Sequence, residues 1–105
     1  MPDKQAASTA PESAGATAPP QHAVLARAWA ALRRGDAETA LALVERDYIM
    51  YPKSAFAEER EALRIVTLRR LHRPAEARAA AKAFAARYPD SIHRRLVDPA
   101  LEETP

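Results

Sequence analysis

The chain has 105 residues, and its composition shifts near residue 20, so it has room for one domain of about 80 residues. It contains no cysteine, which excludes disulfides and thiol chemistry, and no apolar run approaches the roughly 18–20 residues that cross a bilayer. The net charge of +2 hides a basic surplus over residues 55–97, which hold ten Lys and Arg against five Asp and Glu. We interpret this surplus as the solvated face of helices and expect neither nucleic-acid binding nor direct membrane insertion.

Residues 1–20 form the first segment, which holds four of the nine prolines and no large apolar side chain after Met1. Such a segment cannot bury enough apolar surface to offset the entropy lost on ordering. We therefore predict a disordered Pro/Ala-rich tail or tether that holds the rest of the chain away from an upstream anchor or domain. A tail without function is the alternative.

Residues 21–50 carry the pattern of a helical hairpin. Apolar side chains recur at helical spacing over 21–34 and again over 37–50, which predicts two helices. Between them, Gly35 suits a left-handed helix C-terminus and Asp36 suits a helix N-cap. The predicted inward faces comprise Val24, Leu25, Ala28, Trp29 and Leu32, and then Ala40, Leu41, Val44 and Tyr48.

A second hairpin is predicted to follow. Ser54 is the expected N-cap of a broadly apolar helix over 55–71, which we expect to be buried on two sides and about one turn longer than the first helix. Pro74 suits the first turn of the next helix, which is expected to end at Pro89. Its inward face comprises Ala77, Ala80, Ala81, Phe84 and Tyr88.

A short fifth helix is predicted over 92–97, capped by Asp90 and Ser91 and ended by Asp98 and Pro99. Two hairpins are fewer than the three or so that repeat stacks need, so this helix should cover the open face of the second hairpin. The covering side chains are expected to be Ile92, Leu96 and Val97. If they leave apolar surface exposed, that surface would drive dimerisation.

The sequence repeats itself at an offset of 37 residues. The segment Tyr-Pro-Lys-Ser at 51–54 returns as Tyr-Pro-Asp-Ser at 88–91, and the same offset maps Ala40 onto Ala77. Each copy is therefore predicted to be a helix, a tight turn and a second helix.

This spacing resembles that of the tetratricopeptide repeat family. Gly35, Ala40 and Pro52 stand where that family has its turn glycine, the small residue at the helix crossing and the terminal proline, and Ala77 and Pro89 repeat two of these three. The second copy departs from the pattern by having a histidine, residue 72, at the glycine position, and the offset exceeds the family's usual length of about 34. The resemblance implies an all-α fold of two helix-turn-helix hairpins in a right-handed superhelical stack, with a short C-terminal capping helix. Another helical bundle is the alternative.

The tyrosine-proline-x-serine ending is similar to repeats found in bacterial cell-envelope proteins. This similarity implies the soluble part of a membrane-tethered envelope or regulatory protein, and it favours a periplasmic or envelope-associated location over a cytoplasmic one. The expected organisation is a tail over 1–20, a repeat domain over 21–98 and an acidic tail over 99–105.

The residue types that carry catalysis or bind metals do not converge in the sequence. His22, His72 and His93 lie at unrelated spacings without paired carboxylates, and no glycine-rich loop is present to bind a phosphate. We therefore expect no enzyme activity, no cofactor and no metal. Three arginine pairs are expected at or near helix C-termini, where cations complement the helix dipole.

These observations favour a non-catalytic adaptor that binds a protein or peptide partner. The first helix of each hairpin is expected to line a shallow groove in which Trp29 serves as an aromatic anchor flanked by charge. The candidate partner-binding residues are Leu25, Trp29, Glu59, Val66, Arg69 and Arg70. Packing of Trp29 in the core is the alternative for that residue, and a self-associating homodimer is the alternative function.

Overall fold

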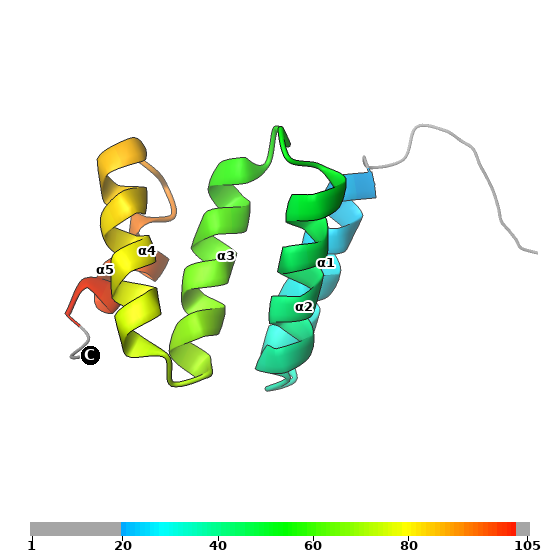
Figure 1. Ribbon diagram of the computed structural model, residues 1–105, viewed down its shortest axis with the longest axis horizontal. Coiled ribbons are helices and arrows are strands. Elements are labelled where there is room, and N and C mark those ends of the chain that lie inside the picture. Colours follow the sequence, from blue (N-terminus) through cyan, green and yellow to red (C-terminus); the bar gives the residue numbers. More distant parts are fainter. Residues whose placement is uncertain (1–19, 103–105) are drawn as a thin grey trace, which may run out of the picture.

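The computed structural model describes residues 20–102. Apart from Pro20, the tail predicted over 1–20 lies outside the described residues, and so do residues 103–105 of the predicted acidic tail. The regular structure of the described part is entirely helical (Figure 1). The helices are α1 (Pro20–Arg33), α2 (Ala37–Met50), α3 (Ala57–Arg70), α4 (Pro74–Arg87) and α5 (Arg94–Leu101). The predicted all-α fold of two stacked hairpins and a short last helix is confirmed.

The backbone repeats with the same 37-residue offset as the sequence. The helices α1, α3 and α5 begin at residues 20, 57 and 94, and α2 and α4 begin at 37 and 74. The first four helices each have 14 residues, whereas α5 has eight. The last helix is therefore the structural equivalent of the first half of α1 and of α3.

The two hairpin turns share an unusual backbone conformation. Gly35 has a φ of 84° and His72 a φ of 58°, so both are left-handed. After each of these residues, the next amide donates to the carbonyl five residues back, at 2.9 Å in the first hairpin and 3.0 Å in the second. Such bonds end a helix when a residue just beyond its last turn is left-handed. The prediction for Gly35 is confirmed, and His72 adopts the same conformation at a cost of about 1 kcal/mol.

The expectation that the third helix is longer than the first is wrong. Both have 14 residues, and the loop from 51 to 56 precedes α3. Ser54 is not the N-cap of α3, because the cap position falls on Phe56; instead the Ser54 Oγ accepts the Phe56 amide at 2.9 Å. Ser91 likewise accepts the amide of His93 at 3.0 Å, before α5 begins. Each serine stabilises a turn ahead of its helix, which delays the helix start.

The fifth helix also differs from its prediction. It starts at Arg94 rather than 92 and continues through Asp98 and Pro99 to Leu101, so residues 99–101 belong to the helix and not to a tail. Pro99 is tolerated within this two-turn helix. The Arg94–Asp98 ion pair, at 2.7 Å, also stabilises the helix. Ile92 and Leu96 do not cover the second hairpin, since they are 88% and 39% exposed; Val97 and Ala100, both fully buried, do so.

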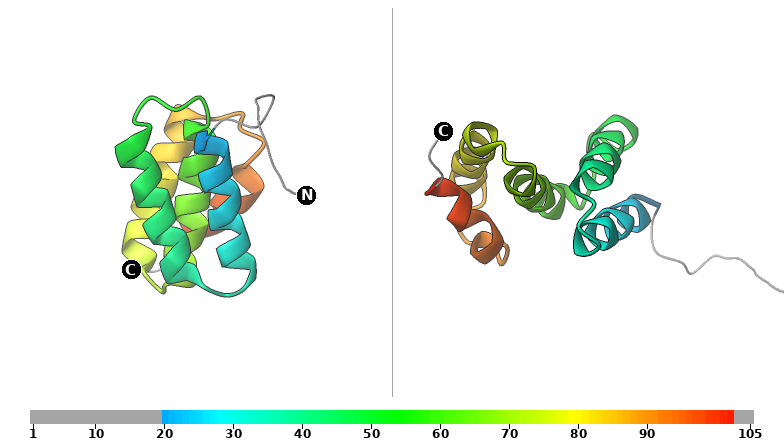
Figure 2. Two further views of the ribbon diagram at one scale, coloured as in Figure 1. Left: turned by 90° about the vertical axis from the view of Figure 1, so that its right-hand side faces the viewer. Right: turned by 90° about the horizontal axis from the view of Figure 1, so that it is seen from below.

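The core consists of two clusters that meet at α3. In the view from below, α3 lies between the α1–α2 hairpin on one side and α4 with α5 on the other (Figure 2). Leu63 packs into the cluster of the first hairpin, whereas Ile65 and Leu68 pack with α4 and α5, so α3 is buried on two sides as predicted. Ala40 and Ala77 are both fully buried. Each large apolar side chain in these clusters contributes about 1.5–3 kcal/mol.

Candidate functional site

The predicted groove residues lie between α1 and α3, but one of them cannot face a partner. Leu25 is fully buried in the core of the first hairpin, so its assignment to the binding surface is wrong. Trp29 is half-buried, and its indole Nε1 donates to Glu59 Oε2 at 3.0 Å. This bond joins the first helices of the two hairpins.

The remaining predicted residues also contact the chain itself. Val66 is half-buried and packs against the same cluster as Trp29. Arg70 Nη1 lies 3.4 Å from the carbonyl oxygen of Leu32, at the end of α1, where carbonyls lack helical partners. Arg69 is half-buried and interacts within the chain. The seam that joins the two hairpins thus comprises Trp29, Glu59, Val66 and Arg70.

A buried ion pair, which the sequence analysis missed, joins α2 to α3. Arg60 Nη1 lies 3.0 Å from Asp47 Oδ2 and 2.9 Å from the carbonyl of Tyr51, and the guanidinium lies 4.0 Å from the centre of the Tyr48 ring. Asp47 is fully buried and Arg60 is 3% exposed. The sequence carries a signal for this pair, because Asp47 follows Val44 on the inward face of α2. Buried charges of this kind need a partner, so the pair has a structural role.

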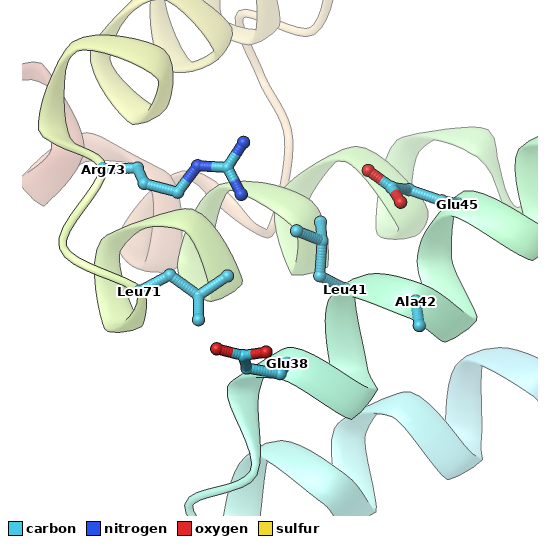
Figure 3. A pocket seen from close by; sticks show the side chains of 6 residues that line it. All are labelled: Glu38, Leu41, Ala42, Glu45, Leu71 and Arg73. Atoms are coloured by element: carbon cyan, nitrogen blue, oxygen red, sulfur yellow. The ribbon is translucent and has the colours of Figure 1, made fainter.

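A shallow hollow opens beside α2, where the turn between α3 and α4 approaches it (Figure 3). Leu41 and Leu71 are half-buried and face each other across it, whereas Glu38 and Glu45 are exposed at its rim. Its volume of about 280 Å³ is slightly below the range of ~300–1,000 Å³ that is typical of small-molecule sites. The hollow therefore suits one or two side chains of a larger partner. Its lining residues are Glu38, Leu41, Ala42, Glu45, Leu71 and Arg73.

The charge of the hollow is negative. Arg73, the one cation among the lining residues, donates from Nε and Nη2 to the two carboxylate oxygens of Glu76 at 2.6 and 3.0 Å. These hydrogen bonds raise the pKa of Arg73 and lower that of Glu76, and Glu45 adds only a weak Coulombic effect on Arg73. Within residues 20–102, the side-chain carboxylates of Glu38 and Glu45 make no hydrogen bond and no ion pair. Two carboxylates at the rim are thus left without a neutralising partner.

The second hairpin has an equivalent hollow with the opposite charge. It is lined by Ala75, Arg78, Ala79 and Lys82 on α4. The 37-residue offset maps these positions onto the four α2 residues of the first hollow, so Lys82 stands in the place of Glu45 and Ala75 in the place of Glu38. The second hollow lacks a counterpart of Leu71 and Arg73, because α4 alone lines it, and its charged side chains are cationic where those of α2 are acidic.

Metal-binding side chains do not gather among the described residues. Residues 20–102 contain no group of three or more His, Asp or Glu side chains that could hold a metal ion. His22 packs against Phe56 with ring centres 5.2 Å apart, and His72 occupies the turn before α4. None of the helices described is both long and apolar enough to cross a membrane.

Comparison with known proteins adds no relative. No family model matches the chain, and no curated protein or solved structure matches it either. The likeness to tetratricopeptide repeats therefore rests on the turn glycine, the crossing alanines and the terminal prolines.

Proposed function

We propose that the chain is a non-catalytic interaction module of the tetratricopeptide type that binds a segment of another polypeptide. The observation that carries the proposal is the hollow beside α2, which combines a half-buried apolar floor, Leu41 and Leu71, with exposed carboxylates at its rim. Apolar anchors surrounded by polar groups are typical of protein interfaces. The hollow is also of a size for side chains of a partner rather than for a free metabolite.

The hollow is a better candidate than the surface around Trp29. The Trp29 indole and Glu59 are hydrogen-bonded to each other, and Arg70 is directed to the end of α1. A partner at that surface would have to replace bonds that already hold the hairpins together, which lowers the net gain on binding. At the hollow, Glu38 and Glu45 lose no bond within residues 20–102 when a partner binds.

Peptide selection tests this proposal. Peptides selected from a random displayed library on the immobilised full chain should bind it in solution, as measured by fluorescence anisotropy. Replacing both floor residues, Leu41→Ala and Leu71→Ala, should weaken that binding about tenfold, since each removes buried apolar contact. Ile49→Ala is the matched control, because Ile49 is an apolar residue of α2 that is 82% exposed and lies outside the hollow. Equal binding to both variants, or no selected peptide, would contradict the proposal.

Self-association is a second candidate function, and one observation favours it. Ile92, two residues before α5, and Leu96, within it, are both exposed, and α5 corresponds to only about half of α1 and α3. Two copies could cover these side chains by packing their α5 helices together. Sedimentation over a range of concentrations tests this candidate: a dimer that is lost on Ile92→Ser with Leu96→Ser supports it, and a monomer at all concentrations excludes it.

A further inference from the structure

The rim of the hollow has a defined spacing of charge. Glu38 and Glu45 are seven residues apart on α2, which places them on the same helix face and separates them by about 10 Å along the axis. Leu41 lies between them, so this face presents a carboxylate, an apolar side chain and a second carboxylate in order. A complementary ligand must match that order and that distance.

The negative charge is local to this part of the molecule. Residues 36–47 hold four acidic side chains and one basic one, whereas the whole chain has a net charge of +2. Arg60 neutralises Asp47, and Glu76 binds Arg73. The charges that a ligand would meet at the hollow are therefore those of Glu38 and Glu45. A cationic ligand would be attracted here, although the chain as a whole is basic.

The equivalent hollow on α4 would repel the same ligand. It has Ala75 at the position of Glu38 and Lys82 at the position of Glu45, so neither carboxylate of the rim recurs there. A cation that contacted this second hollow would face Lys82, and such like-charge repulsion favours binding at the hollow on α2. A cationic ligand should therefore bind the hollow on α2 and not the hollow on α4.

We propose that a basic polypeptide segment occupies the hollow, an inference that rests on the proposed function. The segment presents two cationic side chains about 10 Å apart, with an apolar side chain between them. The apolar side chain covers Leu41 and Leu71, and the cations pair with Glu38 and Glu45. A helix with arginine or lysine at two positions seven residues apart has this spacing on one face. Two such rim pairs contribute chiefly to specificity and to the rate of association.

The test uses designed peptides and the full chain. The probe is an alanine-rich helical peptide that carries two arginines seven residues apart and a leucine between them on the same face. The control peptide has citrulline, which is uncharged and nearly isosteric, in place of each arginine. The arginine peptide should bind about tenfold more tightly at low ionic strength, and this advantage should shrink as salt is added.

Variants of the chain locate the effect. Glu38→Gln with Glu45→Gln should abolish the advantage of arginine over citrulline. Asp90→Asn with Glu102→Gln changes the net charge equally at exposed positions outside the hollow and should preserve that advantage. If both double variants lose it alike, the attraction is non-specific and the inference fails.

The outcome also separates this inference from the proposed function. If library-selected peptides depend on Leu41 and Leu71 but the arginine probe has no advantage over citrulline, the basic segment is excluded and the interaction module stands. If no peptide, selected or designed, depends on the hollow, both proposals fail.

Discussion

Arg60 Nη1 lies 3.0 Å from Asp47 Oδ2, and both side chains are almost completely buried where α2 meets α3. At the equivalent junction of the second repeat, the 37-residue offset places Phe84 and Val97, which pack in one apolar cluster. The same junction in the fold is thus held by an ion pair in one repeat and by apolar packing in the next.

This substitution between repeats makes a prediction. Asp47→Ala or Arg60→Ala should lower the free energy of unfolding by about 3–5 kcal/mol, because each leaves a buried charge without its partner. The double variant Asp47→Phe with Arg60→Val copies the second junction and should recover most of that loss. Urea unfolding of the three variants measures the effect. A double variant no more stable than the single ones would show that the two junctions are not interchangeable.

The left-handed turns make a second prediction. His72→Gly should raise the free energy of unfolding by about 1 kcal/mol, because glycine adopts a positive φ without steric cost. Gly35→Ala should lower the free energy of unfolding by a similar amount. No atom lies within 4 Å of the added Cβ, so this loss would come from the backbone conformation and not from a clash with a neighbour. The control is His93→Gly, at a position whose φ is −89°, where no gain is expected. Thermal unfolding compares the three.

The contrast between Val97 and Leu96 predicts how α5 is held. Val97→Ala should cost about 2 kcal/mol, because Val97 is fully buried against α3 and α4. Leu96→Ala on the same helix should cost less than about 0.5 kcal/mol, since Leu96 is 39% exposed. Equal costs would mean that α5 packs through a different face. Denaturant unfolding at fixed temperature distinguishes these results.

Glu61 predicts a pH dependence of stability. Burial raises its pKa above the ordinary value of 4.5, and the nearby Arg64 and Arg87 only partly offset this. As the pH rises from 4.5 through the raised pKa, the unfolded chain releases this proton more readily, so the free energy of unfolding falls. Glu61→Gln stays uncharged and should therefore be more stable than the original chain at neutral pH. The difference should close below pH 4.5, and melting temperatures across this range test it.

Several features of the fold follow from the sequence alone. Apolar spacing identified five helices, and the offset of 37 residues identified the repeat because the turn and ending residues recur at fixed positions. Gly35 could be assigned a left-handed conformation because glycine adopts it without cost. These are local properties, and local patterns are sufficient to predict them.

Other features depend on contacts that local patterns do not show. Residues 55–56 continue the apolar spacing of α3, so the local pattern predicts a helix start at the place where Ser54 makes a turn. Pro99 predicts a helix end, because a local pattern does not show the packing that keeps it inside the two-turn helix α5. The hollow requires α2 and the turn at Leu71 to approach each other, and the sequence gives no sign of that approach.

Amide chemical shifts of the full chain, mapped as a selected peptide is added, locate the surface that binds the partner. If the hollow is the binding site, the largest changes fall on residues 38–45 of α2 and on residues 71–73 of the turn between α3 and α4. Changes centred on Trp29 and Glu59, or on α5, with the hollow unaffected, would contradict this assignment.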